Sequence, residues 1–497
     1  MFKSKKNIFL FYLISSIIFY ICINGLDLFN TIVAQWYPNI TNYLIYDISK
    51  INPQKAFDEP FNKFYLIFFD ISFSILLFYF IFIYFFNYFF KDQFEIFHLR
   101  IIWTIKCVIS LFVVLLYELN FGLDQNTYFY LSVNNVNTYS DNFGLGSMSI
   151  FPNLSSNSNM VNLLRGINFF TLNSWFSIKI FFAFLFLMTV INFYKLINIY
   201  HGGKKIITLY LLSILPSFIL FTSIVTKDAI ILCLTSFIFL VASTFKKKYF
   251  VNLLLIITFL VLIFIIRKWM SLFILFAFIA TVSMIYFYKV NLTYRLLIFS
   301  TLIILLLIGF EYLNSILLTT ETKDLFAVFY RYIMAANYLD GYISYSSALS
   351  ENLEDTTCLS CSGSRSLANK SNLFEIIVLY PKMMFLSIFS PFIFDLRQMT
   401  YLIPILENLM VLALFIVSFF NLKKEYFYFY LYLINLILIF SISYAVINYL
   451  NMGNSFRYSL FMRYIIYAFA IGININFIES IIIYVYKKTK SLWRPSI

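Results

Sequence analysis

The sequence is poor in charged residues, and this shortage is its most informative feature. Asp, Glu, Lys and Arg make up 12% of the 497 residues, whereas 62% are hydrophobic. A soluble protein of this length needs a larger share of charged side chains on its surface. Apolar runs of about 18 or more residues recur along the chain, and such runs are typical of membrane-spanning helices. The composition therefore predicts an all-α, polytopic transmembrane bundle that forms a single integral membrane domain over residues 1–497.

Several residue types and motifs that build common sites are also scarce. The only histidines are His98 and His201, and we expect both on the cytoplasmic side. A histidine-based metal site or a serine–histidine triad on the outer face is therefore not expected. The chain has no glycine-rich phosphate loop, no Asp-x-Asp pair and no internal repeat that can be defended. We accordingly expect no metal and no cofactor. The 64 Phe and 39 Tyr match the bias of an AT-rich genome and carry no functional argument.

The net charge of +13 would indicate a nucleic-acid partner in a soluble protein, but a membrane protein offers a simpler explanation. Basic residues concentrate on cytoplasmic loops and orient the helices. With the N-terminus inside, five basic clusters fall on the cytoplasmic side: Lys3/Lys5/Lys6, Lys204/Lys205, Lys246–Lys248, Lys423/Lys424 and Lys487/Lys488/Lys490. We therefore expect no nucleic acid, and a multi-pass protein of the inner (plasma) membrane with both termini in the cytoplasm.

The apolar runs predict about twelve membrane helices. Their ranges are 8–25, 64–90, 101–119, 174–195, 206–225, 228–245, 249–266, 269–288, 296–313, 402–421, 426–447 and 464–485. A further apolar segment, 372–398, is interrupted by Pro381, Lys382 and Pro391. Broken backbone at membrane depth is tolerated where protein buries it, so we expect a re-entrant or interfacial segment on the outer face.

The predicted loops are longer outside than inside, which indicates that the outer face is the working face. The long outer loops are 26–63, 120–173 and 314–401, and the last carries Cys358 and Cys361. This C-x-x-C spacing suits redox chemistry or half a zinc site in the cytosol, but an oxidising outer face favours a local disulfide. The cysteines in predicted helices, Cys22, Cys107 and Cys233, are expected in the core.

Two charged pairs stand where the chain is otherwise apolar. Lys227 and Asp228 fall in one short outer turn, and Arg267 and Lys268 fall in the next. Thr226 as an N-cap, with Asp228 in the first helical turn, is one explanation of the first pair. Snorkelling to the membrane surface is one explanation of the second. Because ionisable groups at membrane depth are costly, both pairs are also functional-site hypotheses.

Other charged residues join these candidates, and some of them are expected to form simple ion pairs. Those in or near predicted helices also include Lys106, Glu118, Lys179, Glu311 and Arg463. The candidates for a site are Asp124 at the start of the loop 120–173, Arg331 in the loop 314–401, Glu407 early in the helix 402–421, and Arg457 before the last helix.

These residues and their order resemble a broad bacterial family of polytopic membrane proteins of surface-polysaccharide biosynthesis, described as O-antigen-polymerase-like or membrane glycosyltransferase-like. The resemblance covers roughly residues 120–470. Its motifs are Asp124 with Tyr128; Leu215-Pro216-Ser217 with Lys227-Asp228; Arg267-Lys268-Trp269; Pro381 with Ser390-Pro391-Phe392 and Glu407; and Asn451 with Gly453 and Arg457. The chain departs from the family where Ile393-Phe394 replace the usual Trp. It also departs where Arg331 to Gly341 is one residue short of an arginine-x10-glycine loop motif.

The resemblance implies a polymerase or glycosyltransferase that acts on polyprenyl-diphosphate-linked oligosaccharides at the extracytoplasmic face. Fixed cations would bind the diphosphate, and a carboxylate would act as general base on the acceptor hydroxyl. The expected diphosphate-binding residues are Lys227, Arg267, Lys268, Arg331 and Arg457. The candidate bases are Asp124, which we prefer, Asp228 and Glu407. The expected partners are the lipid-linked glycan, membrane lipids and other polysaccharide-assembly proteins.

A lipid-linked oligosaccharide flippase, or another polysaccharide transporter, is the alternative, because such proteins also have about twelve helices and buried cations. The lack of a two-fold repeat and the long outer loops favour an enzyme. An accessory membrane subunit without its own activity is a third hypothesis.

Overall fold

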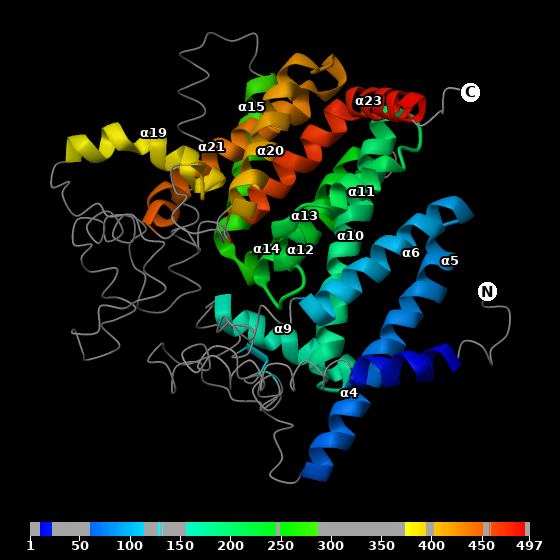
Figure 1. Cartoon of the computed structure of the whole chain (residues 1–497). Coiled ribbons are helices and arrows are strands. Elements are labelled where there is room, and N and C mark those ends of the chain that lie inside the picture. Colours follow the sequence, from blue (N-terminus) through cyan, green and yellow to red (C-terminus); the bar gives the residue numbers. More distant parts are fainter. Residues whose placement is uncertain are drawn as a thin grey trace. The chain divides into compact units, whose positions relative to one another are not determined.

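The computed structural model of the chain is described over residues 10–21, 60–113, 128–129, 132, 156–244, 249–286, 373–393, 402–450, 457 and 459–492. Every regular element in these residues is a helix, which confirms the all-α prediction at this level (Figure 1). The chain folds into two compact units. Unit 1 is Met1–Leu196, Lys204–Ile214 and Phe218–Arg267, and unit 2 is Ile197–Gly203, Leu215–Ser217 and Lys268–Ile497.

Unit 1 is built on helices from the first half of the chain. They are Leu10–Ile21, α4 (Pro60–Phe80), the π-helix η2 (Ile81–Phe85), α5 (Phe86–Phe89), α6 (Gln93–Val108), the π-helix η3 (Ile109–Val113), α9 (Ser156–Thr171), most of α10 (Trp175–His201), α11 (Ile207–Ser213), most of α12 (Pro216–Phe221), α13 (Lys227–Ser243) and α14 (Tyr249–Ile266). Helix α13 packs along α14, and α9 also contacts α14. The first turns of α13 are buried, whereas most of α14 is exposed on its apolar surface. Helix α13 is therefore an inner helix of this unit.

Unit 2 is built on helices from the second half. They are α15 (Lys268–Tyr286), α19 (Leu373–Phe389), α20 (Leu402–Phe420), the 3-10 turn η9 (Lys424–Tyr426), α21 (Phe427–Leu450) and α23 (Leu460–Leu492). Helix α21 packs against both α15 and α19, and α20 packs along α23. The first half of α23 is almost wholly buried, with a mixture of large apolar side chains and one arginine, Arg463. The core of unit 2 therefore surrounds the start of α23.

Six helices in the described residues are long and apolar enough to cross a membrane. They are Asp70–Phe89, Trp175–His201, Tyr249–Ile266, Leu402–Phe420, Phe427–Tyr444 and Leu460–Tyr484. The protein is thus a helical membrane protein by the length and composition of these segments. The larger number of about twelve, and the predicted helix at 296–313 and loops at 26–63 and 314–401, involve residues outside the described ranges.

Three predictions about local structure need correction. The predicted helix 206–225 is broken into α11 and α12 at Ile214 and Leu215, just before Pro216, which cannot donate a backbone hydrogen bond. Pro381 does not interrupt the segment 372–398, because α19 continues through it to Phe389. A proline inside a helix removes one backbone hydrogen bond, and the other bonds of α19 persist around it.

The third correction concerns the outer loop predicted over 120–173, which contains α9. The polar sequence of α9 hides an apolar stripe that the structure buries. Met160, Leu164 and Ile167 recur at intervals of four and three residues, and this spacing places them on one face of a helix. This periodicity was present in the sequence and is the pattern that could have predicted α9.

Candidate functional site

Helix α13 begins where its sequence predicts. Thr226 has an extended backbone, and its hydroxyl accepts a hydrogen bond from the backbone N–H of Ala229 at 3.4 Å. The same hydroxyl donates to the carbonyl oxygen of Phe221 at 2.8 Å, which joins the end of α12 to the start of α13. Asp228 in the first turn adds the negative charge that a helix N-terminus favours. The N-cap interpretation of Thr226 is thus confirmed.

Replacing Thr226 by alanine removes both bonds of its hydroxyl, so we expect the free energy of unfolding to fall by about 1–2 kcal/mol. Thr226→Ser keeps the hydroxyl and should stay close to the parent protein. Detergent unfolding followed by far-UV circular dichroism measures both variants. Equal losses in the alanine and serine variants would show that the missing methyl group, rather than the cap, is responsible.

Asp228 of the first predicted turn meets Arg267 of the second in unit 1. Nη1 of Arg267 donates a hydrogen bond to Oδ1 of Asp228 at 2.6 Å, and the two groups form an ion pair. The side chain of Asp228 is 0% exposed and that of Arg267 only 12% exposed. Because Arg267 is largely covered and ion-paired, snorkelling to the membrane surface does not describe it. Lys227 is buried as well. Lys227, Arg267 and Asp228 are instead close together and largely shielded from solvent by the surrounding protein.

Tyr128 and α9 complete this part of the unit. Nζ of Lys227 lies 5.4 Å from the ring centroid of Tyr128, a cation–π contact between two of the sequence motifs described above. Asn159 of α9 donates from Nδ2 to the carbonyl oxygen of Ile265 at 2.6 Å, two residues before Arg267. Asn159 therefore holds the last turn of α14 from which Arg267 extends. We call Tyr128, Lys227, Asp228 and Arg267 the α13 cluster.

Glu407 is the centre of a second buried cluster, in unit 2. Its carboxylate accepts a hydrogen bond from the backbone N–H of Ser217 at 2.7 Å and another from the Ser217 hydroxyl. Nη1 of Arg463 lies 3.7 Å from Oε1 of Glu407, and both side chains are almost completely buried. Arg463 was noted in the sequence but was not assigned to the site. Arg457, which was assigned, precedes it by six residues.

Asn408 links this pair to the segment that contains Ser390 and Pro391. Its Oδ1 accepts from Nη1 of Arg463 at 2.8 Å, and its Nδ2 donates to the carbonyl oxygens of Phe389 and Pro391 at 3.1 and 2.7 Å. We call Ser217, Glu407, Asn408 and Arg463 the Glu407 cluster. Because Glu407 is buried, accepts two hydrogen bonds from Ser217 and lies beside Arg463, its geometry suits a structural carboxylate better than a base that meets an acceptor sugar.

Lys106 is another charged residue in an apolar predicted helix, and the structure shows which groups stabilise its buried ammonium. Its Nζ donates to the carbonyl oxygen of Ile219 at 2.6 Å and to the hydroxyls of Thr222 and Ser223 at 2.9 and 2.5 Å. The same ammonium lies 4.6 Å from the ring centroid of Phe186. Lys106 thus satisfies acceptors near the C-terminal end of α12, where cations are favoured. Its role is structural.

The other predicted residues are placed less fully. Asp124, Arg331, Cys358 and Cys361 lie outside the described residues, so their contacts and the predicted disulfide stay predictions. Lys268 begins α15 and belongs to unit 2, as does Arg457. The α13 cluster belongs to unit 1. The structure therefore brings Lys227, Asp228 and Arg267 together, and it pairs Glu407 with Ser217 and Arg463.

Neither histidine belongs to these clusters. Nδ1 of His98 lies 2.5 Å from the hydroxyl of Tyr210, and Nε2 of His201 lies 3.0 Å from the hydroxyl of Tyr426. Within the described ranges, no group of three or more His, Cys, Asp or Glu side chains is placed to hold a metal ion. Cys107 and Cys233 are buried free thiols, as expected of core residues.

Comparison with known proteins gives no relative. The chain matches no protein-family model, no curated protein and no solved structure.

Proposed function

We propose that the protein is a membrane polysaccharide polymerase or glycosyltransferase that acts on polyprenyl-diphosphate-linked oligosaccharides. In this proposal it works at the extracytoplasmic face of the inner membrane, with both termini in the cytoplasm. The observation that supports it is the α13 cluster. Lys227, which is buried, and Arg267, which is largely buried, are two cations next to one carboxylate, Asp228, so these three side chains together carry one net positive charge.

The chemistry of the donor explains why such a cluster is useful. A polyprenyl diphosphate leaves with additional negative charge when its bond to the sugar breaks. Fixed cations in a poorly hydrated site stabilise that charge more strongly than solvated ones. Arg267 is oriented by its bond to Asp228, and Lys227 is oriented by the ring of Tyr128. Both cations are therefore preorganised, and Asp228 positions Arg267 rather than acting as the base.

In the proposed reaction the acceptor hydroxyl oxygen forms a bond to the anomeric carbon of the donor sugar. The bond from that carbon to the diphosphate oxygen breaks, and the electron pair stays on the diphosphate. The hydroxyl proton passes to a carboxylate. We assign this role to Asp124, which stands only four residues before Tyr128 in the sequence. Diphosphate binding by Lys268, Arg331 and Arg457 stays a prediction from the sequence.

The test is the chain length of surface glycan in a deletion strain that carries variants of the protein. Lys227→Met removes a proposed diphosphate contact, and Arg267→Lys keeps the charge but loses the planar donor fork. We expect Lys227→Met to give mainly single repeat units and Arg267→Lys to give shortened chains, with membrane levels of the protein unchanged. Lys423→Met removes an exposed lysine and is the control.

Wild-type chain lengths in both variants would remove the α13 cluster from the proposal. The deletion strain separates the alternative function. A polymerase defect leaves lipid-linked units on the outer leaflet, whereas a flippase defect traps them on the inner leaflet. Lipid-linked units found only inside would therefore replace the polymerase with a transporter.

A further inference from the structure

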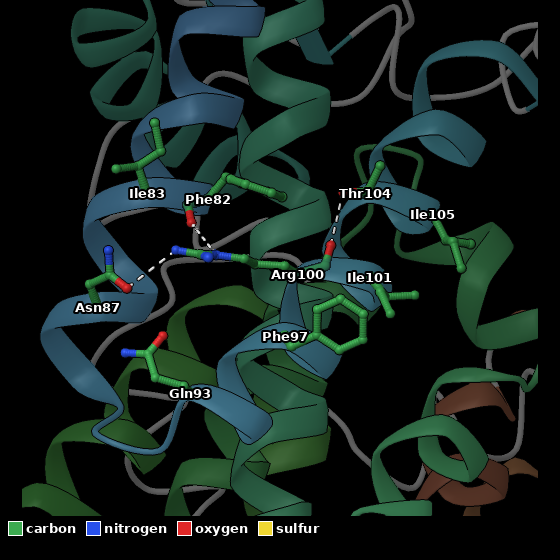
Figure 2. Close-up of a pocket in the computed structure, with 9 residues that line it drawn as sticks. All are labelled: Phe82, Ile83, Asn87, Gln93, Phe97, Arg100, Ile101, Thr104 and Ile105. Carbon is green, nitrogen blue, oxygen red and sulfur yellow. Dashed lines mark hydrogen bonds between the residues drawn. The ribbon is translucent and has the colours of Figure 1, made fainter. Parts of the chain in front are cut away.

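A pocket of about 880 Å³ lies in unit 1 between the π-helix region and α6 (Figure 2). One end carries polar groups, and the rest of its wall is apolar. Its polar lining residues are Asn87, Gln93, Arg100 and Thr104, and Phe82, Phe97, Ile101 and Ile105 belong to its apolar wall. None of these belongs to the α13 cluster, and the pocket is independent of the proposed function.

Arg100 is the charged residue of the pocket, and two bonds fix its position. Its Nε donates to the carbonyl oxygen of Phe82 at 3.0 Å, and its Nη2 donates to Oδ1 of Asn87 at 3.2 Å. The guanidinium also lies 5.0 Å from the ring centroid of Phe82. Among the described residues, no acceptor takes a hydrogen bond from Nη1. Arg100 therefore presents an oriented donor group in the pocket.

Phe82 lies in η2, and this local geometry matters. A π-helical turn is wider than an α-helical turn and is often found at functional sites. Here the backbone N–H of Phe86 bonds to the carbonyl oxygen of Ile81, five residues earlier, and the Phe82 carbonyl accepts from Arg100 on the neighbouring helix α6. The pocket is thus shaped by an irregular turn as well as by its side chains.

Carboxylates close to the polar end do not cancel the charge of Arg100. Nζ of Lys204 donates to Asp92 at 2.7 Å and to Glu95 at 3.3 Å. The hydrogen bond from Lys204 is the main reason that the pKa of Asp92 is lowered from its ordinary value. Lys204 is the shared partner of both carboxylates, whereas Arg100 bonds to the neutral groups of Phe82 and Asn87. Among the described residues no carboxylate forms an ion pair with Arg100, so its guanidinium can bind an anionic ligand.

The apolar wall is open to the surroundings of unit 1. Phe97 and Ile105 are 59% and 53% exposed, although both are large apolar residues. The facing segment belongs to a candidate membrane span, Asp70–Phe89. In a bilayer such side chains contact acyl chains. A ligand of this pocket must therefore combine a negatively charged group with a hydrocarbon chain.

We propose that the pocket binds an anionic phospholipid of the surrounding membrane. The phosphate accepts hydrogen bonds from Nη1 of Arg100, and Asn87 and Gln93 surround the polar head group. An acyl chain lies along Ile101 and Ile105. A zwitterionic lipid offers the same phosphate with a cation attached, so the net charge of the head group decides the selectivity.

Native mass spectrometry of the purified full-length protein tests this site. The probe is an equimolar mixture of phosphatidylglycerol and phosphatidylcholine with the same acyl chains. We expect the parent protein to retain phosphatidylglycerol preferentially. Arg100→Gln should weaken this retention by about tenfold, because one charge-assisted contact is lost. Lys423→Gln removes a positive charge from an exposed site elsewhere and should leave retention unchanged.

A second pair of variants tests the site without changing its charge. Thr104→Trp fills the pocket beside Arg100 and should abolish retention of phosphatidylglycerol, whereas Thr104→Val keeps the size of the side chain and should leave retention unchanged. The Thr104 pair decides the question if Arg100→Gln fails to fold. Equal retention of the two lipids by the parent protein, or full retention of phosphatidylglycerol by a folded Thr104→Trp variant, would overturn the proposal.

Discussion

Arg463→Met is expected to lower the free energy of unfolding by about 3–5 kcal/mol, the largest effect of any substitution described in this protein. The methionine fills a similar volume, so the loss comes from the charge that stays behind. Glu407 is almost fully buried and would keep only the two donors of Ser217. Asn408 would also lose the donor to its Oδ1.

The double variant Glu407→Gln/Arg463→Met separates the charge effect from packing. A glutamine keeps an oxygen acceptor for the N–H of Ser217 but carries no charge that needs a partner. We therefore expect the double variant to be more stable than Arg463→Met alone, which is the sign of strong coupling between neighbours. Detergent-induced unfolding followed by far-UV circular dichroism measures the cycle. Additive losses would mean that the 3.7 Å ion pair contributes little.

Arg267→Met is expected to have the second largest effect, a loss of about 2–3 kcal/mol. It leaves the carboxylate of Asp228 buried without its ion-pair partner. The loss is smaller than at Arg463 because Asp228 lies in the first turn of α13, where the helix N-terminus partly stabilises a negative charge.

Replacing the other partner of the ion pair tests this explanation, because the two substitutions should lower the free energy of unfolding by different amounts. Asp228→Asn should cost less than Arg267→Met, because the partly exposed Arg267 can turn toward water whereas Asp228 cannot. Lys423 offers a control, since its side chain is exposed to solvent. Lys423→Met should leave the unfolding midpoint unchanged. A larger loss from Asp228→Asn than from Arg267→Met contradicts the burial argument.

The sequence predicted the helical class and the start of α13 because both depend on local patterns. Long apolar runs indicate membrane helices, and Thr226 followed by Asp228 is a local N-terminal signature. The sequence also predicted that Asp228 and Arg267 lie close together, since they stand in two successive outer turns between predicted helices. The pairing itself could be anticipated, but the extent of its burial could not.

Other features depend on contacts between distant residues and were missed. No local pattern in α6 indicates that Lys106 binds the end of α12, more than a hundred residues later. Likewise, Arg463 rather than Arg457 meets Glu407, because the start of α23 packs along α20. The sequence alone does not show which of two arginines six residues apart faces a carboxylate on another helix, because helix packing determines this. By contrast, α9 was missed although its apolar spacing was readable.

The burial of α13 has a consequence for how this sequence can change over generations. Residues 227–236 are almost all buried and include small residues such as Ala229, Thr235 and Ser236. Helix α14, which is largely exposed, consists almost entirely of bulky apolar residues, and there one can replace another without disturbing a packed neighbour. A mutational drift toward phenylalanine and isoleucine codons can therefore remodel α14 freely. In α13 the same substitutions would clash with packed neighbours, so we expect the inner helix to change more slowly than α14.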